Sequence, residues 1–177
     1  MIISVEEAKK LVDFKDWTDA KIERKLKAIE QTIRAYTNNN FQNRGFRIYA
    51  CIKEGAFKSE SLIPFAVGDT IQVSLSKSNG GLFTVAEVID DNTFTVIEDV
   101  HDEDDMMITK ISYPDDVVDC ALNLLEWEIN NRAKVGIQSE TLSRHSVTYF
   151  AQDANNQVMG YPVSLLGGLK AHRKARC

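Results

Sequence analysis

Apolar residues recur at helical spacing near the beginning of the chain. Over residues 19–37 they stand three or four positions apart, at Ile22, Leu26, Ile29, Ile33 and Tyr36. Thr18 precedes this run as a candidate N-cap, and residues 38–40 are asparagines, which tolerate the left-handed backbone that ends a helix. The pattern predicts an amphipathic helix with one narrow apolar stripe.

A second run of helical spacing covers residues 114–135. Pro114 suits the first turn of a helix, and Asp115 and Asp116 follow where the helix dipole favours carboxylates. One face is apolar, at Val117, Ala121, Leu124, Leu125 and Ile129. Gly136 is a natural residue to follow a helix end. This stretch predicts one long helix.

Two shorter helical stretches lie near the ends of the chain. Ser4 and Glu7 have the spacing of a capping box and predict a helix over residues 5–12. Pro162 can start a last helical turn, whose apolar residues are Leu165, Leu166 and Leu169.

Between the two long helices the hydrophobic period changes from helical to two. Five segments alternate as strands do, at residues 47–52, 70–74, 82–88, 93–97 and 107–111. A Lys-Ser-Asn-Gly-Gly loop at 77–81 is a strong hairpin signal, and 90–92 is another turn. Short strands with frequent turns predict a small antiparallel barrel or meander.

These elements give an α+β fold in two parts. Residues 1–44 and 113–177 form a small helical bundle, and residues 45–112 form an inserted antiparallel β subdomain. Residues 146–150 alternate and predict an edge strand, after which the chain continues as an extended C-terminal arm.

Composition places few limits on this picture. Of 177 residues, 44% are hydrophobic and 27% charged, as in soluble globular proteins, and no apolar run reaches the ~20 residues of a membrane span. The net charge of −5 argues against a surface that binds nucleic acid throughout. The odd set Cys51, Cys120 and Cys177 predicts free thiols in a reducing compartment, with Cys120 buried.

The residues that could carry chemistry do not form a known arrangement. Residues 98–105 are rich in carboxylates, but they are consecutive and lack the glycine of a calcium loop. They are expected to form a solvated acidic loop, with a weak cation site or a subunit contact as alternatives. The three histidines share no motif, so no catalytic residue, metal or cofactor is expected.

The C-terminal tail is basic. It can be a frayed terminus, or a docking segment with Leu165, Leu166 and Leu169 as apolar anchors and Arg173, Lys174 and Arg176 as charged contacts.

The order of these features resembles the head–tail connector family of tailed phages, the neck adaptor proteins of siphophages and related prophages. Four stretches carry the resemblance. The first is residues 14–19 with 33–41, and the second is residues 65–71 and 81–85, followed by 113–116. The third is residues 134–141 with 146–149, and the fourth is residues 160–162 with the leucines and basic residues up to 176.

The resemblance implies a structural virion protein rather than an enzyme. Such adaptors form rings, typically of twelve copies, under the portal, where they join it to a stopper or tail-completion protein and extend the DNA channel. The free protein is often a monomer until it meets a template. The resemblance implies that the protein lies in the virion neck, and in the host cytoplasm during assembly. It also implies that DNA passes through the ring without sequence-specific binding and that the protein does not contact a membrane. Carried onto this chain, portal contacts would be Leu169, Lys170, Arg173, Lys174 and Arg176, and subunit contacts would be Ser146, Val147, Thr148, Tyr149, Glu126 and Asn130.

An alternative is a phage-encoded interaction module without catalysis, in particular a small β barrel that binds nucleic acid. Its acidic segment at 98–105 and its lack of interleaved basic and aromatic residues weaken this alternative. Phe83, Phe94 and Tyr49 are expected in the barrel core.

Overall fold

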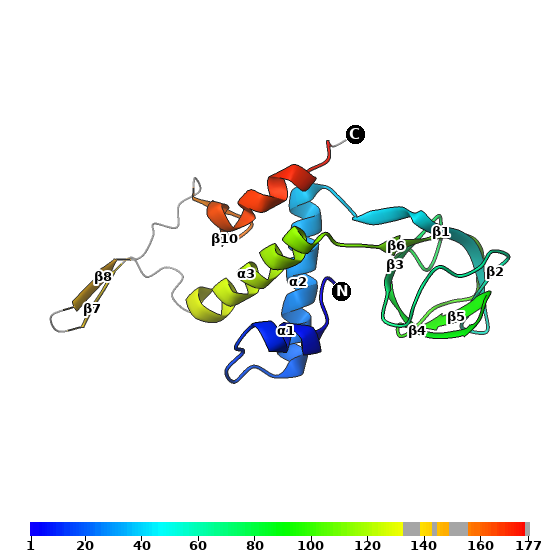
Figure 1. The fold of residues 1–177 in the computed structure, drawn as a ribbon, viewed down its shortest axis with the longest axis horizontal. Helices are drawn as coiled ribbons and strands as arrows, with labels where there is room; N and C mark the ends of the chain where they lie inside the picture. The colour runs from blue at the N-terminus through cyan, green and yellow to red at the C-terminus, as the bar shows by residue number, and fades with distance from the viewer. Residues whose placement is uncertain (133–138, 143–144, 149–155, 176–177) are drawn as a thin grey trace. The chain divides into compact units, whose positions relative to one another are not determined.

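A computed structural model describes residues 1–132, 139–142, 145–148 and 156–175 (Figure 1). The chain divides into two compact units, which we call the helical unit, Met1–Asn39 with Pro114–Cys177, and the barrel unit, Asn40–Tyr113. The predicted α+β fold with an inserted barrel is confirmed. The predicted boundary at residues 44 and 45 lies inside the first strand, since pairing of that strand begins at Gln42.

Two helices form the first part of the helical unit. Helix α1 (Val5–Leu11) has the predicted capping box: Glu7 N donates to Ser4 Oγ over 3.2 Å, and Ser4 N donates to Glu7 Oε2. Helix α2 (Asp19–Thr37) ends at Asn38, whose φ of 48° is left-handed. The predicted stripe of α2 is confirmed, since its four aliphatic residues Ile22, Leu26, Ile29 and Ile33 are fully buried.

Helix α3 (Asp115–Asn131) starts one residue later than predicted, with Pro114 as its N-cap. Its buried residues include Val117, Ala121, Leu124 and Leu125, as the apolar spacing predicts. The predicted stop at Gly136 falls outside the described residues. In the part of the chain that the structure describes, no helix is long and apolar enough to cross a membrane.

The C-terminal part of the helical unit is more folded than an extended arm. Strands β7 (Ser139–Leu142) and β8 (His145–Thr148) form a separate antiparallel hairpin, in which Ser139 pairs with Thr148 and Leu142 with His145. Strands β9 (Gln157–Val158) and β10 (Tyr161–Pro162) form a short hairpin that leads into the 3₁₀ helix η2 (Val163–His172). The last helical turn that Pro162 and the leucines predict is confirmed, and it continues to His172.

The barrel unit is a closed six-stranded antiparallel barrel (Figure 1). Its strand order is β1 (Gln42–Lys53), β2 (Ala56–Ser59), β5 (Thr93–Val96), β4 (Gly81–Asp90), β3 (Thr70–Ser74) and β6 (Glu103–Ile111). Strand β2 was not predicted; Glu54 and Gly55, both with positive φ, make the tight turn that pairs it with β1. Closure leaves no exposed sheet edge.

Aromatic rings fill the barrel core. The rings of Phe57 and Phe94 stack with centroids 4.8 Å apart, and the edge of Phe65 meets Phe94 at 5.6 Å. Phe83 also lies in this core, as predicted. The expectation for Tyr49 is wrong: its side chain is 65% exposed, because it alternates with the inward-facing neighbours Ile48 and Ala50.

The Phe94 side chain provides a test of whether the barrel has its own stability. We expect Phe94→Ala to destabilise the barrel unit by about 3–5 kcal/mol, since it removes a stacked, buried ring. Amide hydrogen exchange of the barrel strands measures this loss. Fluorescence of Trp17 and Trp127, which both lie in the helical unit, should show an unchanged unfolding midpoint.

The matched control is Thr95→Ala, on the opposite face of the same strand, with an expected cost under about 1 kcal/mol. A tryptophan transition that moves together with the barrel amides would contradict separate cores.

Candidate functional site

The most strongly bonded side chain of the helical unit is Glu128, near the end of α3. It is 3% exposed. Its Oε2 accepts from Lys25 Nζ of α2 over 2.9 Å, and its Oε1 accepts from the Tyr161 hydroxyl over 2.8 Å. Arg132, one turn further along, donates from Nε to Oε2 over 3.0 Å and from Nη2 to Oε1. The carboxylate therefore joins α2, α3 and β10.

The electrostatics of this network keep Glu128 ionised. Burial raises the pKa of its carboxyl. Hydrogen bonds from Arg132, Lys25 and Tyr161 lower the pKa by a larger amount, so that it falls to about 2. Burial and the same carboxylate raise the pKa of the Tyr161 hydroxyl far above its ordinary value. A carboxylate held in this way does not exchange protons near neutral pH, so the network is an anchor rather than an acid–base site.

Aromatic contacts extend the anchor. The edge of Trp127 meets the Tyr161 ring at 5.5 Å, and the Arg132 guanidinium lies 5.0 Å from the Trp127 ring centre. Arg132 Nη1 also donates to the Gly160 carbonyl over 3.4 Å. Together these contacts fix the start of the C-terminal segment on α3.

The C-terminal helix η2 is part of the core of the helical unit. Leu166 and Leu169 are fully buried, and Cys120 Sγ of α3 donates to the Leu165 carbonyl over 3.2 Å. Burial, with the nearby Asp116 carboxylate, raises the pKa of the Cys120 thiol to about 11, so the thiol is protonated and unreactive. The structure thus places Leu169, a predicted portal contact, inside this chain's own core.

The end of the tail is fastened to the C-terminus of α2. Lys174 N donates to the Thr37 carbonyl over 2.8 Å, and Asn39 Nδ2 donates to the His172 carbonyl over 3.1 Å. Asn38 Nδ2 reaches the Ala175 carbonyl over 3.0 Å. A terminus bonded in this way through residue 175 is not frayed.

A side-chain contact near the end of the tail also reaches α3. His172 Nε2 lies 2.7 Å from Asp116 Oδ2, and this hydrogen bond holds the pKa of the Asp116 carboxyl below its ordinary value.

The basic side chains of the tail stand on this fixed backbone. Lys170, Arg173 and Lys174 are exposed, and the Arg173 guanidinium lies 5.4 Å from the Tyr36 ring centre. We call these three residues the basic corner. Arg176, also predicted as a portal contact, lies outside the described residues.

The predicted subunit contacts lie in two places. Ser146, Val147 and Thr148 belong to β8, and Tyr149 lies outside the described residues. Glu126 and Asn130 are both exposed on α3. Lys15 Nζ, in the loop between α1 and α2, donates to Asn130 Oδ1 over 3.1 Å, a contact that the sequence pattern did not indicate.

The acidic segment at 98–105 is only partly a solvated loop. Glu103 begins strand β6, and its carboxylate accepts hydrogen bonds from Ser76 Oγ, the Lys77 and Ser78 backbone N–H groups and Asn79 Nδ2. Among the described residues, no group of three or more His, Cys, Asp or Glu side chains could hold a metal ion. Glu103 instead organises the loop that follows β3.

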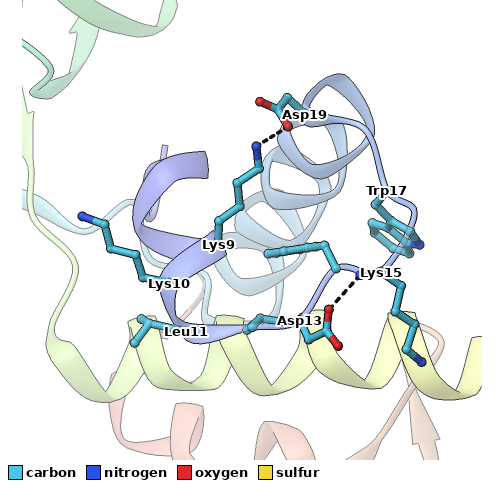
Figure 2. Close-up of a pocket in the computed structure, with 9 residues that line it drawn as sticks. Lys9, Lys10, Leu11, Asp13, Lys15, Trp17 and Asp19 are labelled. Atoms are coloured by element: carbon cyan, nitrogen blue, oxygen red, sulfur yellow. Dashed lines mark hydrogen bonds and ion pairs between the residues drawn. The ribbon is translucent and has the colours of Figure 1, made fainter.

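A hollow of about 520 Å³ lies beside α1 and the loop to α2 (Figure 2). Lys9 and Asp19 point toward one another and form an ion pair, and Asp13 Oδ1 accepts from the Lys15 backbone N–H over 3.0 Å. Leu11 points away from Trp17. The residues that line this hollow include no serine, cysteine or histidine, so they offer no Ser–His or Cys–His pair.

Sequence reasoning did not identify Glu128 or its partners. One signal was present: Glu128 follows Leu124 by four positions and so stands on the apolar face of its helix. A carboxylate at such a position needs cations to pair with it, but nothing in the pattern points to Lys25 or Tyr161.

We expect Glu128→Gln to destabilise the helical unit by about 3 kcal/mol, because it leaves the cations Lys25 and Arg132 beside a neutral amide. Chemical denaturation followed by tryptophan fluorescence measures the effect. Glu126→Gln, two positions away and exposed, is the control and should change stability by under about 0.5 kcal/mol. Equal effects of the two variants would show that the network adds no stability.

The low pKa of Glu128 also predicts an acid-labile helical unit. Its folded-state pKa of about 2 lies below the ordinary value of 4.5, so its contribution is complete above pH 4.5 and is lost as the pH falls toward 2. Denaturation of the wild type at pH 5 and pH 3 should show this loss, and Glu128→Gln should show a smaller one. An identical pH dependence in both proteins would contradict the assignment.

In the helical unit, the exposed basic corner stands on a backbone held by hydrogen bonds to the end of α2. The buried Glu128 carboxylate is bonded to Lys25, Arg132 and Tyr161. No protein-family model matches the chain, and no curated protein matches it.

Proposed function

We propose that this protein is a structural subunit of the neck of a tailed phage, one that forms a ring between the portal and the stopper or tail. In this function it acts by assembly, without catalysis. Its place is the virion neck, and DNA passes through its ring without specific binding. The resemblance of its sequence to neck adaptors motivates the proposal.

The observation that carries the proposal is the basic corner of the helical unit. Lys170, Arg173 and Lys174 are exposed, while the backbone around them is bonded to Thr37, Asn38 and Asn39. A charged surface that is already ordered loses little conformational entropy when it docks. Lys and Arg at such a surface suit carboxylates on a portal ring.

The charge of the barrel unit supports a role beside passing DNA. Residues 40–113 carry twelve Asp and Glu and six Lys and Arg, a formal charge of −6, whereas the whole chain carries −5. Acidic surface repels phosphates, so DNA can slide past it, whereas a basic surface would hold the DNA.

The hairpin β7–β8 supports contacts between subunits. It is a two-stranded sheet with four residues in each strand. Hairpins of this size are marginal alone in water and gain stability by pairing or packing with further structure. A neighbouring copy in a ring would supply that structure, which keeps Ser146, Val147 and Thr148 as proposed subunit contacts.

A second candidate function is binding of nucleic acid by the barrel, and one observation favours it. Phe46 and Tyr49 are exposed on β1 on either side of Arg47, which is the kind of interleaving that stacks bases. The acidic balance of the barrel unit opposes this function.

Reversing the basic corner tests the proposed function. We expect a chain that carries Lys170→Glu, Arg173→Glu and Lys174→Glu to lose binding to purified portal rings of the encoding phage, because three attractive charges become repulsive. Co-sedimentation with the rings measures this binding. The tryptophan unfolding midpoint should stay close to that of the wild type.

The control chain carries the same change of charge at the exposed residues Arg24, Arg44 and Lys58 and should still bind. Undiminished portal binding by the basic-corner variant would rule out this docking surface. A salt-dependent gel shift of DNA by the free chain, lost in Tyr49→Ser, would favour the second candidate instead.

A further inference from the structure

The loop between β3 and β4 contains the pair Asn79–Gly80, and no other asparagine of the chain is followed by glycine. In such a pair the glycine nitrogen can attack the side-chain carbonyl carbon of the asparagine, because glycine has no Cβ to obstruct the approach. Gly80 also lies in open space, since a Cβ added there would meet no atom within 4 Å. By its sequence, this is the asparagine of the chain most exposed to deamidation.

The folded barrel holds the Asn79 side chain out of this reaction. Asn79 is 4% exposed, and its Oδ1 accepts from the His101 N–H over 2.8 Å. Its Nδ2 donates to the His101 carbonyl over 2.9 Å and to Glu103 Oε2 over 2.8 Å. Nδ2 is the atom that deamidation removes as ammonia, so the reaction requires both of its hydrogen bonds to break.

Glu103 connects the Asn79 side chain to the rest of the loop. Its carboxylate accepts from the Ser76 hydroxyl over 2.7 Å and from the Ser78 N–H over 3.1 Å. Ser76 Oγ in turn accepts from the Asn79 N–H over 2.6 Å. The loop and the Asn79 side chain are therefore released together when the Glu103 hydrogen bonds are lost.

The loop also contains a strained residue, which favours its opening. Leu75 is 69% exposed and has a φ of 60°, in the left-handed region that aliphatic residues seldom adopt. Holding its backbone in this region costs free energy that an open loop recovers. The folded loop thus depends on the hydrogen bonds of Glu103 and Asn79.

We propose that Asn79–Gly80 is a self-modification site, which the hydrogen bonds to Glu103 and His101 keep inactive while the loop is folded, and whose product keeps the loop open. The modification needs no partner, ring or DNA, so the inference is independent of the proposed function.

The reaction consumes only water. The Gly80 nitrogen forms a bond to Asn79 Cγ and gives up its proton, the bond from Cγ to Nδ2 breaks, and Nδ2 leaves as ammonia. The cyclic imide that remains is then opened by water at one of its two carbonyl carbons, which yields aspartate or isoaspartate at position 79. No oxidant, reductant or cofactor takes part.

The product opposes the folded loop. The Asn79 Nδ2 that donates to Glu103 is replaced by a carboxylate oxygen, so two acceptors face one another and the His101 carbonyl loses its donor. Donors of the loop hold the pKa of Glu103 at about 2, so Glu103 is ionised and repels the new carboxylate. Deamidation therefore converts an ordered loop into an open one, and the change is irreversible.

The rate of deamidation in the full chain tests whether folding controls the site. Mass spectrometry of the peptide that contains Asn79 measures the rate in native buffer and in denaturant. The native rate should be lower by at least about tenfold, because only the locally open loop reacts. In denaturant, Gly80→Ala should lower the rate by about tenfold, because its Cβ obstructs the attacking nitrogen. Asn92, which is followed by the branched Thr93, is the internal reference and should react slowly in both conditions.

Glu103→Gln tests the role of the carboxylate. We expect it to raise the native rate at Asn79 by at least about tenfold, through a larger open population, and to leave the rate in denaturant unchanged. The matched control is Asp102→Ser, which removes the same charge from an exposed neighbour. Amide exchange at the buried Val85 reports whether the barrel stays folded, and Ser76→Ala replaces Glu103→Gln if it does not.

Asn79→Asp tests the effect of the product. Amide exchange at Lys77 and Ser78, whose N–H groups donate to Glu103, should become at least about tenfold faster. Ser78→Asp adds the same charge at an exposed side chain of the loop and leaves Asn79 in place, so it should change this exchange far less.

Three results would each overturn the proposal. The first is deamidation of Asn79 that is absent in denaturant or equally fast in the folded and the denatured wild type. The second is a native rate in a folded Glu103→Gln or Ser76→Ala chain that does not exceed that of Asp102→Ser. The third is unchanged amide exchange at Lys77 and Ser78 in Asn79→Asp. No portal protein is present, so none of these results bears on binding of the basic corner to portal rings.

Discussion

The buried Glu128 carboxylate is the point at which three segments of the helical unit meet. Lys25 comes from α2, Arg132 from the end of α3 and Tyr161 from the strand that leads into the C-terminal helix. The bond between Lys25 and Glu128 spans 103 positions of sequence, with the whole barrel unit between them. A buried charge without these partners would be costly, so burying Glu128 requires the segments on both sides of the insertion to come together.

The C-terminal segment is part of the folded core of the helical unit. Leu166 and Leu169 complete the core on α2 and α3, and the backbone at residues 172–175 is bonded to the end of α2. The exposed part of the tail is thus a set of charges on a fixed frame, and its leucines belong to the core of the helical unit. An ordered charged surface favours a rapid, oriented encounter with a partner of opposite charge.

The barrel unit uses an ionised carboxylate in a similar way. The Glu103 carboxylate accepts hydrogen bonds from donors in the loop after β3 and so orders this loop. The closed sheet packs around the stacked rings of Phe57 and Phe94. The remaining carboxylates of the acidic segment stay on the surface. One segment therefore has two roles, since a single side chain builds the loop and its neighbours give the barrel its charge.

The sequence by itself determined the elements whose causes are local. The stripe of α2, the capping box of Ser4 and Glu7, the left-handed stop at Asn38 and the hairpin between β3 and β4 all depend on residues within a few positions of one another. Only the tertiary structure decided the partners of Glu128 and Glu103, the burial of Leu169 and the outward position of Tyr49. Each of these depends on contacts or strand register between residues far apart in the chain, and spacing within one segment carries no information about which distant side chain will lie opposite.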